Sequence, residues 1–183
     1  MQSHSERVFT IPNFLSPAEC VELIGLAEAN EFEAASVRTQ SGPQLMANVR
    51  NNQRVMFNSP EWKQRLWTRL SLENLPVFAG NAEAVGLPAN LRFYKYSAGE
   101  RFKMHKDGPW KEGGLVSQLT FLVYLNDGFS GGRTDFRDFV IQPSAGMALL
   151  FIHDTWHEGE KVDSGTKYVL RSDVLYSAAG NAN

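Results

Sequence analysis

Three polar side chains in the second half of the chain could together bind a metal ion. The chain has four histidines, at His4, His105, His153 and His157. His105 and Asp107 are two residues apart, so their side chains share one face of an extended segment. Together with His157 they supply the two imidazoles and one carboxylate of a facial triad, which leaves positions open and suits non-haem Fe(II) and oxygen chemistry.

Each part of this pattern also has a structural alternative. A His-x-Asp tripeptide is common by chance and can be a turn or an ion pair. His153 and His157 are four residues apart, a spacing that binds zinc on a helix, but no Glu follows His153 and the flanking residues favour a strand and a loop. His4 lies in a polar N-terminal segment and is a poor ligand candidate.

The elements that must position these residues change character near residue 90. The first half contains two helix starts, Ser16-Pro17-Ala18-Glu19 and Ser59-Pro60-Glu61-Trp62, and a shorter helix is expected over 81–86. Strand-like segments follow at 91–96, 119–126, 138–142, 148–153 and 167–176, with turn signals between them. This order predicts an α+β, mainly β fold: a sandwich or jelly-roll barrel with helices packed on one face.

Composition narrows the function classes. A chain of 183 residues with net charge −2 fits one globular domain, with a helical part about 1–90 and a β core about 91–177. The net charge gives no sign of a nucleic-acid or membrane-surface binder. Residues 34–72, however, carry several basic residues and only one acid, Glu61. This basic segment could be a solvated face or a docking surface for an anionic partner. With one cysteine, Cys20, no signal peptide and no membrane-length apolar run, we expect a cytoplasmic protein with no membrane partner.

Five segments in order resemble motifs of the prolyl 4-hydroxylase-like Fe(II)/2-oxoglutarate-dependent dioxygenases. They are 13–20, 91–108, 119–136, 143–151 and 157–169, and they cover most of the chain. The resemblance implies a double-stranded β-helix (jelly-roll) core, with Fe(II) held by His105, Asp107 and His157. It also implies 2-oxoglutarate as cosubstrate, O2, and ascorbate as a candidate reductant.

The same resemblance assigns residues around the cosubstrate. Lys167, on the strand after His157, corresponds to the base that pairs with the C5 carboxylate of 2-oxoglutarate, and a buried ammonium is costly unless paired. Tyr124 and Tyr96 correspond to tyrosines that line the cosubstrate pocket, although core packing is the alternative for both. Thr120 shares the strand face of Tyr124.

Arg171 shares the strand face of Lys167 and has three alternative roles. It could contact 2-oxoglutarate, bind a substrate carboxylate, or pair with a structural acid such as Asp173.

The sequence constrains the identity of the substrate less than it constrains the fold or the metal site. The implied reaction is hydroxylation of a protein residue, prolyl foremost, or of an amino-acid-like small molecule, with succinate and CO2 as coproducts. Arg50, Asn52 and Arg54 are candidate substrate contacts in a polar segment that could equally be a solvated loop. Trp156 is a candidate substrate wall or a support for His157, and residues 106–114 are a candidate lid.

Three other functions remain open at this point. The domain could be a non-catalytic jelly-roll binding or sensing module with a vestigial metal site. It could be a metal-dependent dioxygenase that uses no 2-oxoglutarate. A nucleic-acid demethylase on the same fold would need a basic face and an aromatic platform, and only the basic segment 34–72 supports it.

Overall fold

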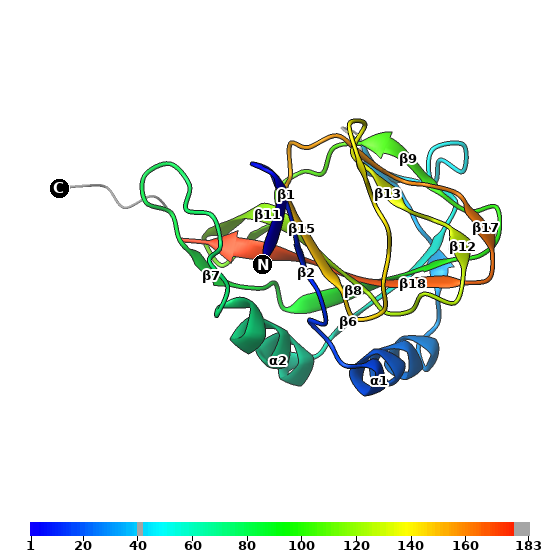
Figure 1. Cartoon of the computed structure of the whole chain (residues 1–183), viewed down its shortest axis with the longest axis horizontal. Coiled ribbons are helices and arrows are strands. Elements are labelled where there is room, and N and C mark those ends of the chain that lie inside the picture. The colour runs from blue at the N-terminus through cyan, green and yellow to red at the C-terminus, as the bar shows by residue number, and fades with distance from the viewer. Residues whose placement is uncertain (40–41, 178–183) are drawn as a thin grey trace.

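The computed structural model describes residues 1–39 and 42–177, and a large antiparallel sheet forms its centre (Figure 1). The sheet has ten strands in the order β1-β2-β15-β11-β18-β8-β6-β3, with β10 paired to β11 and β7 to β18. Its strands are β1 (Gln2–Ser5), β2 (Val8–Ile11), β3 (Glu33–Ala34), β6 (Gln53–Asn58), β7 (Ala84–Gly86), β8 (Asn90–Tyr96), β10 (Lys111–Glu112), β11 (Leu115–Tyr124), β15 (Ala148–Ile152) and β18 (Lys167–Tyr176).

A smaller antiparallel sheet completes the jelly roll. It has four strands in the order β14-β13-β16-β9. Its strands are β9 (Phe102–His105), β13 (Thr134–Asp135), β14 (Val140–Ile141) and β16 (His157–Gly159). Two further strand pairs form separate two-stranded sheets: β12 (Ser130–Gly131) with β17 (Val162–Ser164), and β4 (Val37–Thr39) with β5 (Gly42–Gln44). The predicted mainly β jelly-roll class is confirmed.

Helices α1 (Pro17–Glu28) and α2 (Pro60–Leu70) pack on the opposite side of the large sheet from β9 and β13 (Figure 1). At the start of α1, the predicted capping box is confirmed, because Ser16 Oγ accepts the backbone N–H of Glu19 and the Glu19 carboxylate accepts the N–H of Ser16. Ser59 caps α2 with one hydrogen bond, in which its Oγ accepts the backbone N–H of Trp62. Both helix starts follow the sequence pattern.

The alternation of side chains along the central strands separates a helix-facing core from a cavity-facing layer. On β18, Leu170 and Val174 belong to the core that packs under the helices, whereas Val169 belongs to the second buried cluster. Lys167 and Arg171 fall on the Val169 side, because residues two apart share one face of a strand. Lys167 and Arg171 therefore point between the two sheets.

Two expectations for the first half need correction. The segment 81–86 is not helical: its second half is β7, which pairs with the end of β18, and a six-residue stretch gains more from sheet hydrogen bonds than from an isolated helical turn. The region 1–90 is also not simply helical, since β1, β2 and β6 extend the large sheet. These pairings join strands far apart in sequence, which local patterns do not reveal.

The turn before β15 holds the segment that leads into α1. Gly146 has φ +78° there, and its carbonyl accepts the N–H of Leu15 at 3.0 Å. A Cβ at this position would lie 2.1 Å from the Leu15 carbonyl oxygen. Only glycine fits both the backbone conformation and the close approach.

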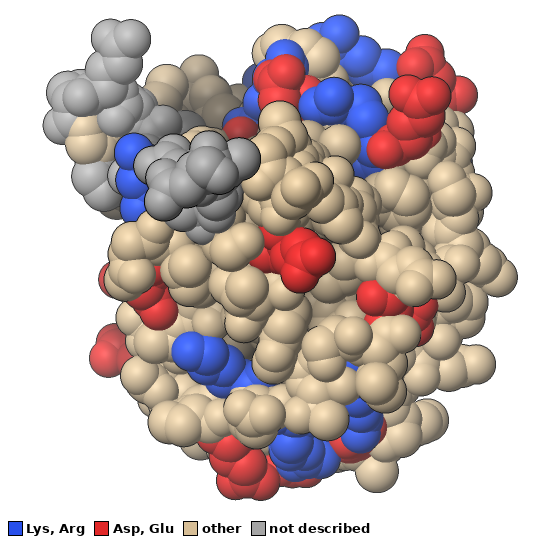
Figure 2. Space-filling view, turned by 90° about the vertical axis from the view of Figure 1, so that its left-hand side faces the viewer, with Lys and Arg blue, Asp and Glu red and all other residues tan. Residues whose placement is uncertain are grey.

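Two surface observations bear on partners. In the described part of the chain, no helix is long and apolar enough to cross a membrane. On the face drawn in Figure 2, acidic and basic side chains of the described residues are interspersed with large uncharged areas. Among the described residues of this face, the basic side chains gathered at its top lie next to acidic ones.

Candidate metal centre and cosubstrate cavity

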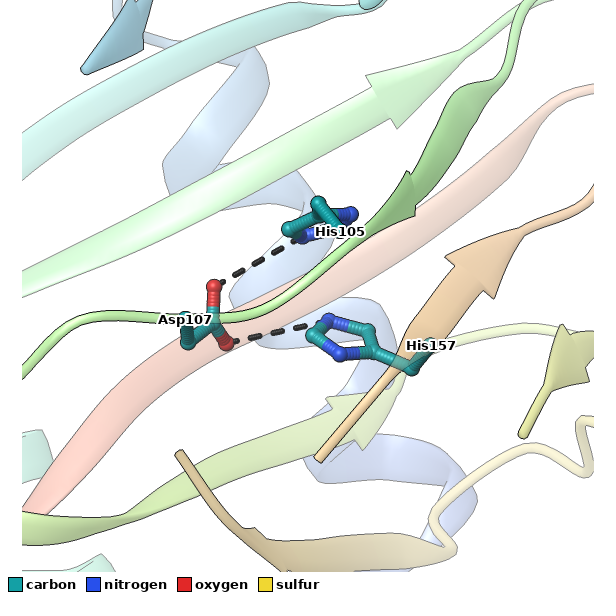
Figure 3. A group of neighbouring side chains, drawn as sticks. All are labelled: His105, Asp107 and His157. Carbon is teal, nitrogen blue, oxygen red and sulfur yellow. Dashed lines mark ion pairs between the residues drawn. The ribbon is translucent and has the colours of Figure 1, made fainter. Parts of the chain in front are cut away.

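Two neighbouring strands of the small sheet, β9 and β16, bring His105, Asp107 and His157 together (Figure 3). His105 ends β9, Asp107 follows two residues later, and His157 begins β16, where it is the register partner of His105. One ligand atom from each residue lies within 4.8 Å of the others. Nε2 of His105 is 3.6 Å from Asp107 Oδ1, and Nε2 of His157 is 3.8 Å from Oδ2. This convergent set of two imidazoles and one carboxylate fits Fe(II).

Backbone carbonyls orient both imidazoles. Nδ1 of His105 lies 2.7 Å from the Lys103 carbonyl oxygen, and Nδ1 of His157 lies 3.0 Å from that of Thr155. A carbonyl only accepts hydrogen bonds, so each Nδ1 carries the proton and each Nε2 presents a lone pair toward Asp107. Phe102 also stacks on the His105 ring at 3.5 Å between centroids.

The charge states of Asp107 and His157 suit cation binding. Burial acts to raise the pKa of Asp107, but its polar surroundings, with the charge of Arg171 foremost, outweigh it and hold the pKa well below the usual range. Burial lowers the pKa of His157 to about 4, although the Asp107 charge opposes this. At neutral pH, Asp107 is therefore ionised and His157 is neutral, which are the forms that bind a metal.

Two side chains fix the Asp107 carboxylate from behind. Thr120 donates its hydroxyl to Asp107 Oδ2 at 2.6 Å, and Arg171 Nη2 lies 3.0 Å from the same oxygen. Arg171 also lies 3.3 Å from Asp173 Oδ1, and Asp173 pairs in turn with Arg92. The structure thus places Arg171 against two acids, one of them the structural acid considered from the sequence.

His153 belongs to this supporting network. Its Nδ1 lies 3.0 Å from Thr120 Oγ1, and its Nε2 lies 2.7 Å from Ser117 Oγ. Its side chain therefore contacts two hydroxyl groups, and among the described residues it is not part of the converging ligand set. Sequence reasoning considered His153 only as a zinc ligand. The signal for its role is that it directly follows β15, the strand that pairs with the Thr120 strand β11.

A cavity of about 860 Å³ lies next to the triad. Lys167 lines it and is 3% exposed, and its ammonium donates to the Gly132 carbonyl at 2.6 Å. Burial lowers the pKa of Lys167 to about 7, because few neighbouring groups replace the lost hydration and only Glu160 acts in the other direction. An anion that enters this part of the cavity would find a poorly compensated cation.

The two predicted tyrosines lie around Lys167. Its Nζ is 5.3 Å from the ring centroids of both Tyr96 and Tyr124. The hydroxyl of Tyr124 lies 2.6 Å from Thr134 Oγ1, a residue that the sequence analysis missed. Both tyrosines are buried and line the cavity. Thr120 lines it too, but its hydrogen bond goes to the candidate metal ligand Asp107.

The four candidate substrate residues separate into different environments. Arg50 lines the cavity and is buried, whereas Arg54 lines it nearer the surface and pairs with Glu33 at 3.1 Å. Asn52 is fully buried and accepts the Arg50 Nε–H at 2.7 Å.

Trp156 is 41% exposed and stacks under Arg137, and it is not among the described residues that line the cavity. The candidate lid does border the cavity, through residues 106–110. The next two residues form β10, which pairs with the main sheet.

Tyr94, which shares the strand face of Tyr96, and Arg92, which sequence reasoning missed, line the same cavity. Burial acts to raise the pKa of Tyr94, but the positive charges of Arg50, Arg171 and Arg92 outweigh it and lower the pKa to about 8. These residues alternate on β8 with core residues, and that period of two was the available signal. The result is a positive potential at this end of the cavity.

A jelly-roll cavity with two imidazoles, one carboxylate and a buried lysine defines the class of iron- and 2-oxoglutarate-dependent oxygenases. Residues 91–172 match the family model of the 2OG-Fe(II) oxygenase superfamily. It is 27% identical over 184 residues to a protein of the prolyl 4-hydroxylase type from Acanthamoeba polyphaga mimivirus, covering 88% of this chain and 71% of the relative.

Two solved structures share the fold. The viral collagen prolyl hydroxylase of Paramecium bursaria Chlorella virus-1, in complex with 2-oxoglutarate, has a TM-score of 0.67 and 20% identity, covering 95% of this chain and 98% of that chain. A prolyl hydroxylase from Trichoplax adhaerens, in complex with a peptide fragment of hypoxia inducible factor, has a TM-score of 0.67 and 18% identity, covering 93% and 84%. The predicted family and enzyme class are confirmed: this is a non-haem iron dioxygenase that uses Fe(II), 2-oxoglutarate and O2.

Proposed function

We propose that this enzyme hydroxylates a carbon atom of a peptide or of an amino-acid-like molecule, with a prolyl ring as the foremost target. The observation that carries the proposal is the position of Lys167 in the same cavity as the triad. Relatives of the prolyl hydroxylase type support the choice of target, and the Trichoplax protein holds a peptide.

Each group at the centre has a role in this proposal. His105, Asp107 and His157 would hold Fe(II) on one face and leave its other positions for 2-oxoglutarate and O2. Bound there, the iron supplies the oxidising chemistry that converts 2-oxoglutarate to succinate and CO2 while one oxygen atom enters the substrate. Thr120 and Arg171 keep the Asp107 carboxylate ionised and oriented.

The far end of the cavity would bind the cosubstrate. Lys167 pairs its ammonium with the C5 carboxylate, and binding of this anion supplies the missing counter-charge. Tyr96 and Tyr124 form the walls on either side and exclude water, which strengthens that ion pair. The buried hydroxyl of Thr134 orients the Tyr124 phenol.

A nucleic-acid substrate has less support than the sequence alone gave it. Within the basic segment 34–72, Arg65 and Arg69 both pair with Glu19, and Arg54 pairs with Glu33. Arg50 is buried in the cavity. Since these described bases are paired or buried, they do not form the free basic face that a nucleic-acid backbone requires.

A peptide library tests the proposal. The enzyme is incubated with Fe(II), 2-oxoglutarate, O2 and proline-containing peptides, and products are searched by mass spectrometry for the gain of one oxygen atom together with succinate release. We expect an oxygen on proline that disappears in Asp107→Ala. Oxygen transfer to another residue type would overturn the prolyl assignment, and succinate release that persists in Asp107→Ala would overturn the proposed centre.

A further inference from the structure

Arg50 is a cation at the triad end of the cavity that forms no ion pair with an acid of the described residues. Arg92 pairs with Asp173, and Arg171 pairs with both Asp107 and Asp173. Among the residues that the structure describes, Arg50 forms no ion pair. Its guanidinium therefore brings an uncompensated positive charge to the cavity wall.

The side chain of Arg50 is held firmly although it lacks an anion. It is 7% exposed, and its guanidinium carbon lies 4.3 Å from the ring centroid of Tyr94 and 4.4 Å from that of Phe102. Its Nε donates to Asn52 Oδ1 at 2.7 Å, whereas its Nη2 is buried with no hydrogen-bond partner. Burying an unpaired cation is costly, so this arrangement is better explained by a ligand than by packing.

The position of Arg50 relates it directly to the reacting centre. Arg50 forms an isolated β-bridge with Phe102, and the Phe102 ring stacks on the imidazole of His105 at 3.5 Å. One aromatic ring thus separates the guanidinium from a candidate metal ligand. Arg50 lines the same cavity as the triad, so a group bound to its guanidinium would lie in that cavity.

Charge matching indicates the kind of group. Lys167 serves the C5 carboxylate in the proposed function, and the C1 carboxylate of 2-oxoglutarate would go to the metal. Arg50 then adds one positive charge, which matches a carboxylate better than a doubly charged phosphate. A fixed guanidinium also fits the planar carboxylate group.

We propose that Arg50 binds a carboxylate of the substrate, so that this enzyme acts on carboxylate-bearing amino acids or peptides. The inference rests on the proposed function, because it needs the cavity to be the substrate site. Asn52 is a positioning residue in this account, since it holds Nε and with it the plane of the guanidinium. The carboxylate can come from a free α-carboxyl group or from an acidic side chain.

An anaerobic binding experiment tests this without turnover. The protein is loaded with Fe(II) and 2-oxoglutarate, and the visible band of that complex is followed while three probe sets are added. The sets are N-acetyl amino acids that include N-acetylproline, their primary amides, and O-phosphoserine. We expect acids to perturb the band, and Arg50→Met to raise their half-saturating concentration by about 10-fold or more.

The amides identify the source of the carboxylate. If only the amides of aspartate and glutamate retain the effect, the bound group is a side chain; if no amide does, it is an α-carboxylate. Arg50→Lys should restore binding in part, since it keeps the charge without the planar fork. Arg133→Met is the matched control, because Arg133 is a surface cation paired with Glu160, and it should bind the acids as the wild type does.

Several outcomes would overturn the inference. These are equal effects of acids and amides, a response to O-phosphoserine alone, no response to any acid, or an unchanged response in Arg50→Met. In each case the band itself still forms, so the proposed function stands. If the band does not form in the wild type, the proposed function fails and this inference fails with it. If Arg50→Met does not fold, the comparison of acids with amides in the wild type decides whether the enzyme binds a carboxylate.

Discussion

Replacing Lys167 with methionine should weaken cosubstrate binding and, at pH 6, stabilise the cosubstrate-free protein. The ammonium of Lys167 is buried with one carbonyl partner, Gly132, and no acid within ion-pair distance among the described residues. Methionine keeps a similar length and removes the charge. A residue that binds a ligand but destabilises the ligand-free fold is expected to show both effects when it is replaced: weaker ligand binding and higher stability.

The structure gives the size of the stability effect. Burial lowers the pKa of Lys167 from 10.5 to about 7, which corresponds to about 4–5 kcal/mol at about 1.4 kcal/mol per pH unit. Loss of the hydrogen bond to Gly132 offsets about 1 kcal/mol of this. We expect Lys167→Met to gain about 3 kcal/mol at pH 6, or about 6–12 °C in Tm.

The sign of the pH dependence follows from the same shift. Because the pKa of Lys167 is lower in the folded protein than in the unfolded chain, the unfolded chain holds the proton more tightly between about pH 7 and pH 10.5. The wild type therefore gains stability as the pH rises through this window. The advantage of Lys167→Met should be full below pH 7 and small by pH 10.

Two assays check this prediction. Urea unfolding of the cosubstrate-free protein at pH 6 and at pH 9 measures stability, and anaerobic titration of the Fe(II) protein with 2-oxoglutarate measures affinity, which we expect to fall by about 100-fold or more. Lys63→Met, on α2 and away from the cavity lining, is the control. A Lys167→Met protein that is less stable at pH 6, or that binds 2-oxoglutarate normally, would refute the reasoning.

Three further predictions follow from the same geometry. Above pH 7, wild-type affinity for 2-oxoglutarate should fall by up to about tenfold per pH unit, since Lys167 must regain its proton to bind an anion; a flat binding profile from pH 7 to pH 9 would contradict this. Thr120→Val should weaken Fe(II) binding by about 10–100-fold, because Asp107 loses its 2.6 Å hydrogen bond; equilibrium dialysis with unchanged affinity would count against that role. Gly146→Ala should destabilise the fold by about 3 kcal/mol or more, since the new Cβ meets the Leu15 carbonyl; a variant with wild-type urea unfolding would show that this turn can adjust.

The sequence was most informative where local spacing determines geometry. His105 and Asp107 are two residues apart at the end of one strand, so an extended backbone alone places them together. The alternation on β18 likewise predicted that Lys167 and Arg171 share a face, and both line the cavity. The capping box at Ser16 is equally local, and it forms as expected.

The features that sequence reasoning missed depend on contacts between distant segments. Arg50 lies in a polar segment, and only the packing of Phe102 and Tyr94 around it shows that its guanidinium is buried. The strand β2 pairs with β15 across most of the chain length, so its place in the sheet has no local signature. Trp156 follows the opposite pattern: it lies next to His157 in sequence, yet its side chain is exposed at the surface.

The most direct test of the central claim is the anaerobic spectrum of the metal-free protein after addition of Fe(II) and 2-oxoglutarate. His105, Asp107 and His157 together with Lys167 predict a weak visible charge-transfer band, and His157→Ala should abolish it. Iron binding without a band, or a band that survives in His157→Ala, would contradict the proposed centre.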